Sequence, residues 1–328
     1  MKKVCLMPFI DLQFNVVGNA YTCCPSYVGN RSIGNIFRQS LAEVWNSEAA
    51  RLLRRKVLAG DYSHCENRYY CGSFDTMGSA EGLSEFCERG PRRINFGQDR
   101  ECNLACLSCR SKIWENTPER RAALDSLIDS LIIPLGKSPD LREARFSVDG
   151  DPLFSPHYRQ CIKILAELNP VCKFAIATNA QYLTEDLLRD LGILERISWL
   201  DISIDAATPE TYKKIRRGGD FQVLLKNLEL AKKLKEKGLI GTFHLKFVVQ
   251  LKNFKEMPAF AHLAASVGAQ AFFWPMRDKK SFVTADGFAQ NSVANPLHPR
   301  HQEFLEILRH PDLRQPHVNL CELGDLVK

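Results

Sequence analysis

The sequence predicts an α/β fold, a partial (β/α)6 TIM-like barrel preceded by a small cysteine-rich module. Three observations support this fold class. From about residue 91, short strands rich in Val, Ile and Phe alternate with helices, as in buried parallel sheets. The first ninety residues instead hold six of the 12 cysteines and show little strand alternation. The length, 328 residues, suits more than one domain. We expect a module at 1–90, a barrel at 91–278 and a C-terminal extension at 279–328.

Composition narrows the class further. Hydrophobic residues make up 45% and charged residues 25% of the chain, which excludes disorder, collagen and coiled coil. The net charge of +6 is weak, and no nucleic-acid partner is expected. Pro8 and Asp11 interrupt the first apolar run, so we expect no secretory signal. No apolar stretch is long enough to span a membrane, and a cytoplasmic location follows. In a reducing compartment, cysteines favour metal, cluster or catalytic thiols over disulfides, or serve as small buried hydrophobes.

The module contains one predicted helix, over residues 41–58. Ser40 is a suitable N-cap, and Glu43 three residues later completes a capping box. Gly60 follows the predicted end, where a left-handed C-cap favours glycine. The loops around this helix can bury little surface by themselves, so bound metal would explain how they hold a shape.

The barrel is predicted from alternating elements. The expected strands are 93–97, 144–149, 173–178, 199–204, 244–249 and 270–274. The expected helices are 118–132, 156–168, 185–191, 221–236 and 256–267. From residue 279 we expect loops and one helix near 301–309. Active sites of such folds lie at the C-terminal ends of the strands, so motifs placed there have priority.

A cysteine triplet follows the first barrel strand. Cys102, Cys106 and Cys109 have the spacing Cys-x3-Cys-x2-Cys, and soft thiolates favour zinc or iron–sulfur clusters. A structural zinc site takes four ligands, usually in two separated pairs, and no fourth ligand stands at such a spacing. Three cysteines on a cluster leave one iron open to an exchangeable ligand. The pattern favours a cluster at the mouth of the barrel, with a zinc knuckle that borrows a distant His as the alternative.

The triplet in this context resembles the radical S-adenosylmethionine (SAM) enzymes, over about residues 91–277. Motifs at successive strand ends are similar to those of the family: Asp149-Gly150-Asp151-Pro152, Thr178-Asn179-Ala180 and Ser203-Ile204-Asp205, followed by Arg216 and Asn253. The SAM-binding residues that the resemblance implies are Gly150, Asp151, Pro152, Asn179, Ser203, Asp205 and Arg216. The chain departs from the family at three positions, Ser108, Asp149 and Ala180, where an aromatic residue and two glycines are common.

The resemblance also implies a chemistry. A reduced four-iron cluster on the triplet would donate one electron to SAM, and the resulting 5′-deoxyadenosyl radical would abstract a hydrogen atom from the substrate. An electron donor such as flavodoxin would be a partner.

The N-terminal cysteines resemble the SPASM module, an auxiliary-cluster domain of radical SAM peptide and protein maturases. The likeness includes Cys5, Gly18 and Cys23, and continues to Cys65-x5-Cys71. The ligands that it implies are Cys5, Cys23, Cys65 and Cys71, with Cys24 and Cys87 as substitutes. Tyr62 and Asp75 stand where the full pattern has further cysteines, so we expect one auxiliary four-iron cluster. A zinc-stapled module is the alternative, because zinc shares these ligands.

The remaining candidates have plainer interpretations. Cys161 and Cys172 are expected in the core. His64 is expected on a loop surface, and Cys321 is left unassigned. Trp274 ends the sixth strand, where it lines a substrate cavity or belongs to the core.

The sequence thus predicts a radical SAM enzyme acting on a peptide or protein side chain, since the module implies such substrates by resemblance. One alternative is a radical SAM dehydrogenase for a small molecule such as a sugar or nucleoside. The other is a non-catalytic iron–sulfur or zinc protein. No catalytic acid or base can be named from the sequence, and the oligomeric state stays open.

Overall fold

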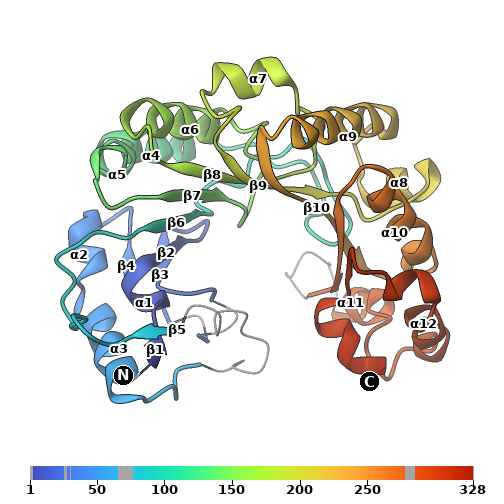
Figure 1. Cartoon of the computed structure of the whole chain (residues 1–328), viewed down its shortest axis with the longest axis horizontal. Helices are drawn as coiled ribbons and strands as arrows, with labels where there is room; N and C mark the ends of the chain where they lie inside the picture. Colours follow the sequence, from blue (N-terminus) through green and yellow to red (C-terminus); the bar gives the residue numbers. More distant parts are fainter. Residues whose placement is uncertain (1–2, 26–27, 30, 66–76, 278–284, 328) are drawn as a thin grey trace. The chain divides into compact units, whose positions relative to one another are not determined.

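A computed structural model describes residues 3–25, 28–29, 31–65, 77–277 and 285–327 (Figure 1). The chain divides into two compact units. The first comprises Met1–Arg100, Asn116–Ala175 and Asp190–Ile193, and the second comprises Glu101–Glu115, Ile176–Arg189 and Leu194–Lys328. Strand β8 (Lys173–Thr178), which was predicted residue for residue, is divided between them.

The first unit contains a sheet to which the cysteine-rich module contributes strands. Its order is β7 (Glu143–Phe146), β6 (Arg93–Phe96), β2 (Asp11–Phe14), β3 (Asn19–Tyr21) and β4 (Gly34–Asn35). The pairs β7–β6 and β6–β2 are parallel, and the last two pairs are antiparallel. A two-stranded ribbon pairs β1 (Lys3–Cys5) with β5 (Met77–Ser79). The sequence predicted no strands in the module, because these strands have two to four residues and are too short to give a visible alternation.

Aromatic packing joins the module strand β2 to the barrel strands. Phe14, Phe96 and Phe146 are each at most 1% exposed. The ring centroids of Phe14 and Phe96 are 6.1 Å apart, and those of Phe96 and Phe146 are stacked at 4.6 Å. Arg93 and Asp11 form an ion pair between the adjacent strands β6 and β2. Burial raises the pKa of Asp11, and Arg93 offsets part of that rise.

The predicted helix over 41–58 is two helices, α2 (Leu41–Trp45) and α3 (Glu48–Ala59). The capping box of Ser40 and the left-handed Gly60 are confirmed. The break arises because Ser47 caps a new helix, with its side chain accepting from Ala50 N at 3.2 Å. The buried Arg54 of α3 donates to the carbonyl of Trp45, the last residue of α2, at 2.8 Å.

Arg54 is the centre of the module's polar core and is 0% exposed. Its guanidinium donates to Pro8 O at 2.9 Å, Asn46 Oδ1 at 3.0 Å, Glu85 O at 3.1 Å and Trp45 O. The guanidinium carbon also lies 4.4 Å from the centroid of the Trp45 ring. A charged group satisfied by four acceptors and a ring replaces part of the apolar core that this short segment lacks.

The other helices of the first unit are α1 (Met7–Ile10), α4 (Pro118–Leu127), α5 (Ile133–Lys137) and α6 (Pro156–Leu168), with a π-turn at Ile128–Ile132. The last five residues of the predicted helix 118–132 thus form the π-turn, and the helix continues past its expected end as α5. Pro134 explains the widened turn, because it lacks an amide donor and its ring displaces the carbonyl four residues earlier.

The second unit has four parallel strands in the order β9 (Ile197–Ser203), β10 (Ile240–Val249), β11 (Gln270–Pro275) and β12 (Val318–Asn319). Its helices are α7 (Glu185–Asp190), α8 (Pro209–Ile215), α9 (Phe221–Glu236), α10 (Met257–Ser266), α11 (Ala285–Asn291) and α12 (His301–Leu308). Short 3-10 turns lie at Phe254–Glu256, Pro311–Arg314 and Cys321–Val327. Helix α8 and strand β12 were not predicted, since neither is long enough to show a period.

The two faces of β10 differ in chemistry. Phe243, Leu245 and Phe247 are at most 2% exposed, and the Phe247 ring packs 4.8 Å from Phe260 of α10. The alternate residues His244 and Lys246 are half-buried on the opposite face. This second face, which we call the inner face, therefore carries the polar side chains of the unit.

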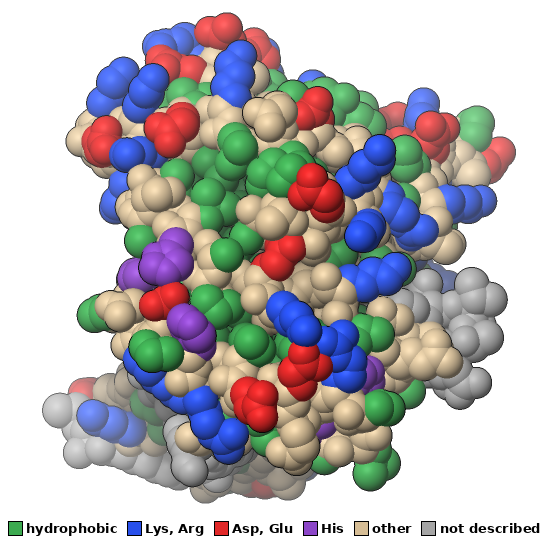
Figure 2. All heavy atoms as spheres, turned by 90° about the vertical axis from the view of Figure 1, so that its right-hand side faces the viewer, with side chains coloured by type: hydrophobic (Ala, Val, Ile, Leu, Met, Phe, Trp, Pro, Cys, Tyr) green, Lys and Arg blue, Asp and Glu red, His purple; other side chains and the backbone are tan. Residues whose placement is uncertain are grey.

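The surface carries mixed charge. On the face drawn in Figure 2, basic and acidic side chains are interspersed, in keeping with the small net charge of +6. Over the described ranges, no helix combines the length and the apolar character needed to cross a membrane.

Candidate active site

The cysteine loop is held by the segment that follows α8. Ala105 N donates to Arg217 O and Leu107 N to Ile215 O, each at 2.9 Å. The Arg217 guanidinium donates back to Ala105 O at 2.7 Å and to Arg110 O at 3.0 Å. Arg217 thus fixes the loop at two carbonyls, on either side of the second and third cysteines.

The three cysteines of the triplet lie in one packed cluster. Cys102 and Cys106 are 8% and 6% exposed and pack with Leu104, and Cys109 is half-buried against them. A tight turn, with Cys109 N donating to Cys106 O at 3.0 Å, sets the spacing of the last two. The structure therefore brings the predicted triplet together.

Each of the three sulfur atoms has a side-chain nitrogen donor. The contacts are Asn179 Nδ2 to Cys102 Sγ at 3.6 Å, Arg216 Nη1 to Cys106 Sγ at 3.4 Å and Arg110 Nη2 to Cys109 Sγ at 3.5 Å. Burial raises the pKa of Cys106, and the Arg216 charge opposes that rise. Donors at all three sulfurs suit thiolates that carry negative charge, as cluster ligands do.

The spacing of these thiols also bears on the choice of metal. Within the described ranges, no three His, Cys, Asp or Glu side chains converge on a point where one metal ion could bind. Cysteines that hold a four-iron cluster bind different iron atoms and lie farther apart than the ligands of one ion. Cluster binding by the triplet stays a prediction, with zinc as its alternative.

An ion pair lies beside the triplet. Arg216 Nη2 is 2.7 Å from Asp205 Oδ2, and the side chains are 11% and 1% exposed. Burial raises the pKa of Asp205, and Arg216 offsets only part of the rise. Burial alone would lower the pKa of Arg216, but Asp205 and Cys106 raise it above its ordinary value.

Two polar atoms of this pair lack hydrogen-bond partners in the described structure. Asp205 Oδ2 and Arg216 Nε are both buried, and the ion-pair contact of Oδ2 is with Arg216 Nη2. One is an acceptor and the other a donor, so a ligand with an ammonium or hydroxyl group and a carboxylate would satisfy both. The amino, ribose and carboxylate groups of SAM fit this requirement.

Asp205 is fixed in an unusual backbone conformation. Its φ is +61°, which disfavours side chains other than Asn and Asp. Its carboxylate accepts from Val248 N at 2.7 Å, and its carbonyl accepts from Asn253 Nδ2 at 2.8 Å. Asn253 therefore positions Asp205 rather than pointing to a ligand of its own. Ser203 lies half-buried at the end of β9.

The strand end at Asn179 is also brought to the triplet. Asn179 Nδ2 donates to Asn103 Oδ1 at 2.8 Å as well as to Cys102. The next residue, Ala180, has φ +62°, where glycine is the usual choice. Its carbonyl accepts from Asn227 Nδ2 at 2.6 Å, which helps to hold this conformation.

The predicted turn at Gly150, Asp151 and Pro152 is described within the first unit. Gly150 has φ +70°, and its amide donates to Asp149 Oδ1 at 3.0 Å. Asp151 is 2% exposed and accepts from Leu153 N at 3.0 Å. The turn is tight and buried, and its contact with SAM stays a prediction.

Of the four predicted auxiliary ligands, two pack together. Cys23 is 8% exposed in a cluster with Met7 and Val28, and Cys5 packs against it. Cys65 follows a turn in which its amide donates to Tyr62 O at 2.9 Å, while the Tyr62 hydroxyl accepts from Cys5 N at 3.1 Å. Cys71, the fourth predicted ligand, lies outside the described residues.

The substitutes are also placed. Cys87 packs with Val4 and Phe9 in a second small cluster that Cys5 also contacts. Burial raises the pKa of Cys87, and the nearby Arg54 opposes the rise. Cys24 is half-buried, and its role as a ligand remains a prediction.

His64 was expected on the surface, and this was wrong. The side chain is 4% exposed, and its Nδ1 has no hydrogen-bond partner among the described residues. Burial lowers the pKa of His64. The expected core positions of Cys161 and Cys172 are confirmed, since both are 0% exposed.

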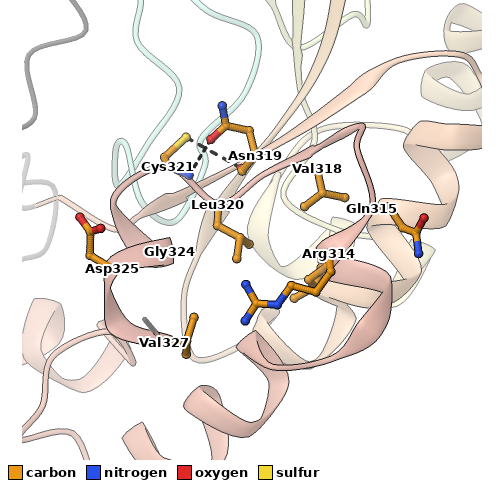
Figure 3. A pocket seen from close by; sticks show the side chains of 10 residues that line it. Arg314, Gln315, Val318, Asn319, Leu320, Cys321, Gly324, Asp325 and Val327 are labelled. Carbon is orange, nitrogen blue, oxygen red and sulfur yellow. Dashed lines mark hydrogen bonds between the residues drawn. The ribbon is translucent and has the colours of Figure 1, made fainter.

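Cys321 lies at a cavity beyond β12 (Figure 3). The cavity has a volume of about 390 Å³, and Arg314, Asn319 and Leu320 are among its lining residues. Asn319 Oδ1 accepts from Cys321 N at 2.8 Å. Burial raises the pKa of Cys321 to about 12, so the thiol stays protonated at neutral pH.

Sequence reasoning missed two features. The sequence marked Arg216 but not Arg217, because nothing local indicates the contacts of Arg217 with the cysteine loop. Asp201, His244 and Lys246 were assigned only to strands, yet they form an ion-pair cluster on the inner face. The alternation of His244 and Lys246 with large apolar residues is the sequence pattern that could have indicated this cluster.

Comparison with known proteins agrees with this geometry. The family model of the Radical SAM superfamily matches residues 100–257. SPASM, described as an iron-sulfur cluster-binding domain, matches residues 5–73. Together these two segments include all seven of the predicted cysteine ligands.

Three curated proteins illustrate the similarity. GTP 3′,8-cyclase of Alkaliphilus metalliredigens is 29% identical over 40% of this chain and 41% of its own length. AdoMet-dependent heme synthase of Methanosarcina barkeri is 25% identical over 56% and 49%, respectively. Mycofactocin maturase MftC of Mycobacterium tuberculosis is 26% identical over 57% and 46%. The matches thus span less than half of each relative.

Among solved structures, native anSMEcpe with bound AdoMet and Cp18Cys peptide is similar over 57% of this chain and 51% of that chain, with 18% identity and a TM-score of 0.43. The two domain matches and the thiol triplet, rather than this overlay, support the assignment. The chain therefore contains a radical SAM domain over residues 100–257 and a SPASM iron–sulfur cluster-binding domain over residues 5–73.

Proposed function

We propose that the protein is a radical SAM enzyme that modifies a peptide or protein side chain. The observation that carries this proposal is the cluster of Cys102, Cys106 and Cys109, beside a buried Asp205–Arg216 pair with one open acceptor and one open donor. When bound, the cluster and SAM supply a 5′-deoxyadenosyl radical that abstracts a hydrogen atom.

The residues of this chain would bind the cluster and SAM, orient them and shield them from water. Cys102, Cys106 and Cys109 would hold the cluster, while the side-chain donors at their sulfurs would stabilise negative charge there. Arg216 would bind the SAM carboxylate, and Asp205 would accept from its amino or ribose groups. Ser203, Asn179 and the turn at 150–152 complete the proposed SAM contacts. We also keep the module at 1–90, the barrel at 91–278 and the extension at 279–328 as proposed domains.

The substrate class rests on the SPASM match. Such a domain would place an auxiliary cluster on Cys5, Cys23, Cys65 and Cys71, and the similar mycofactocin maturase is named for maturation. A small-molecule substrate is the second candidate, because relatives named GTP 3′,8-cyclase also match. An external electron donor such as flavodoxin would reduce the cluster at the triplet.

The first test is reductive SAM cleavage. Anaerobically reconstituted protein with dithionite or flavodoxin should form 5′-deoxyadenosine, measured by chromatography. The Cys102→Ala/Cys106→Ala/Cys109→Ala variant should form none, whereas Cys172→Ala, which removes a core thiol, should keep the activity. Absence of 5′-deoxyadenosine from wild-type protein with full iron content would refute the enzyme and leave an electron-transfer protein.

The second test concerns the auxiliary cluster. Iron and sulfide should remain in the triplet variant and should disappear when Cys5, Cys23 and Cys65 are also replaced. Stoichiometric zinc in place of iron would favour the zinc-stapled module instead.

A further inference from the structure

A polar cluster lies on the inner face of β9 and β10. Asp201 of β9 is aligned with His244 of β10 in the register of the two strands. Asp201 Oδ1 is 2.8 Å from His244 Nδ1, and Lys246 Nζ contacts the other carboxylate oxygen. The Asp201 side chain is only 3% exposed, so its carboxylate is committed to these two partners.

The two partners remain accessible. The side chains of His244 and Lys246 are 19% and 30% exposed. Lys246 Nζ lies 5.6 Å from the centroid of the Trp199 ring, and the His244 ring lies 4.7 Å from that of Phe272. A polar pair flanked by two aromatic rings is the usual composition of a ligand-binding surface.

Strand geometry places this cluster next to the proposed SAM site. Asp201 and Ser203 are two residues apart on β9 and therefore share a face. The step between them is about 6.6 Å along the strand. A substrate that gives a hydrogen atom to a radical generated near Ser203 would thus lie within reach of His244 and Lys246.

Hydrogen-bond chemistry restricts what the cluster can bind. In the uncharged tautomer whose Nδ1–H donates to Asp201, the His244 ring presents Nε2 as an acceptor. Of the two ring nitrogens, Nδ1 makes the described hydrogen bond. Lys246 carries three N–H donors, of which Asp201 occupies one. A matching ligand group must donate to His244 and accept from Lys246, as an amide or a hydroxyl does.

Charge also restricts the ligand. Two cations, Lys246 and Arg277, lie close to Cys321. Asp201 forms an ion pair with Lys246, and Glu322 forms one with Arg277. These cations are therefore balanced, whereas a nucleoside triphosphate brings about four negative charges that need compensation. The arrangement suits a neutral polar group.

We propose that His244 and Lys246 form a substrate-binding subsite for an amide or hydroxyl group of a peptide, with Asp201 as their positioning residue. This inference rests on the proposed function and names the part of the barrel that would recognise its substrate. It also distinguishes a peptide from the triphosphate of a nucleotide.

The test uses a displayed library of random twelve-residue peptides, selected on anaerobic holoenzyme with SAM. Wild-type protein should enrich peptides with Ser, Thr, Asn or Gln at one fixed position. Lys246→Gln should reduce that enrichment by about tenfold, the size expected for a charged hydrogen bond. Asp201→Asn/Lys246→Gln, which leaves no unpaired carboxylate, should do the same if the single variant folds poorly. Lys232→Gln on α9 is the control and should leave the profile unchanged.

A second arm uses radiolabelled GTP in equilibrium dialysis. Wild-type protein should show no saturable binding, whereas Asp201→Asn should bind GTP saturably because Lys246 loses its counter-charge. A merely structural role for Asp201 predicts no such gain. The proposal is overturned if wild-type protein enriches no peptide, if Lys246→Gln leaves enrichment intact, or if wild-type GTP binding depends on Lys246. Formation of 5′-deoxyadenosine by the same preparation keeps these outcomes separate from failure of the proposed function.

Discussion

The ion pair between Arg216 and Asp205 offers a direct test of how burial sets the value of a charge. Replacing Arg216 with Met would leave the Asp205 carboxylate, 1% exposed, without its cation. Breaking a buried pair on one side costs about 3–5 kcal/mol. Arg189 and Glu185 provide the matched control, because they are also 2.7 Å apart but 66% and 37% exposed. Arg189→Met should cost no more than about 1 kcal/mol.

The free energy of unfolding that Arg216→Met loses should depend on pH. The folded-state pKa of Asp205 already lies above its ordinary value of 3.8, so its ionised form opposes folding. Without Arg216 this pKa rises further. Stability contributed by protonated Asp205 is present at low pH and is lost as the pH rises through the folded-state pKa. The deficit of Arg216→Met should therefore be smaller at pH 5 than at pH 8.

Urea unfolding of the iron-free chains, followed by circular dichroism, measures these differences. The double variant Asp205→Asn/Arg216→Met should recover about 2 kcal/mol relative to Arg216→Met at pH 8, because no buried charge remains. Equal losses for Arg216→Met and Arg189→Met, or a pH-independent deficit with additive double-variant energies, would refute the reasoning.

Three further outcomes are expected. Arg54→Ala should destabilise the first unit by about 3–5 kcal/mol, since four acceptors lose a charged donor; urea unfolding checks this against Arg55→Ala, which removes only exposed ion pairs and should leave the unfolding midpoint nearly unchanged. Arg217→Met should lower the iron retained after desalting, because the cysteine loop loses two carbonyl contacts; retention equal to that of Arg189→Met would contradict this. Ala180→Gly should stay within about 1 kcal/mol of wild type, because relief of the left-handed strain offsets the added chain entropy, whereas Ala180→Val should cost more than about 1 kcal/mol; equal unfolding midpoints for the two would count against a strained turn.

Local signals explain which elements the sequence could reveal. The helices Pro156–Leu168 and Phe221–Glu236 were predicted residue for residue, because Ser155 and Asp220 cap them and each has an apolar stripe. The cysteine triplet was equally visible, since its spacing lies within one loop. These features depend on neighbours in the chain.

The features that were missed depend on distant residues. Strand β2 is stabilised by β6, whose partner for Asp11 is Arg93, 82 positions later. The burial of His64 and the contacts of Arg217 with Ala105 likewise follow from packing that no local pattern encodes. The polar residues of β10 are different, because their alternation with apolar residues is visible in the sequence. That alternation could have marked this face as a candidate site.

The parallel pairing of β2 with β6 also has a consequence for synthesis of the chain. Translation proceeds at about 5–20 residues per second, so β6 would emerge about 4–16 s after β2. During that time Leu12 and Phe14, both 0% exposed in the folded protein, have no barrel strand to cover them. Until β6 has been synthesised, the nascent chain exposes the unpaired edge of β2. Holdase chaperones bind such exposed segments. Moving the cysteine-rich segment to the other end of the gene would reverse the order of synthesis, so that β6 would already be present when β2 is made.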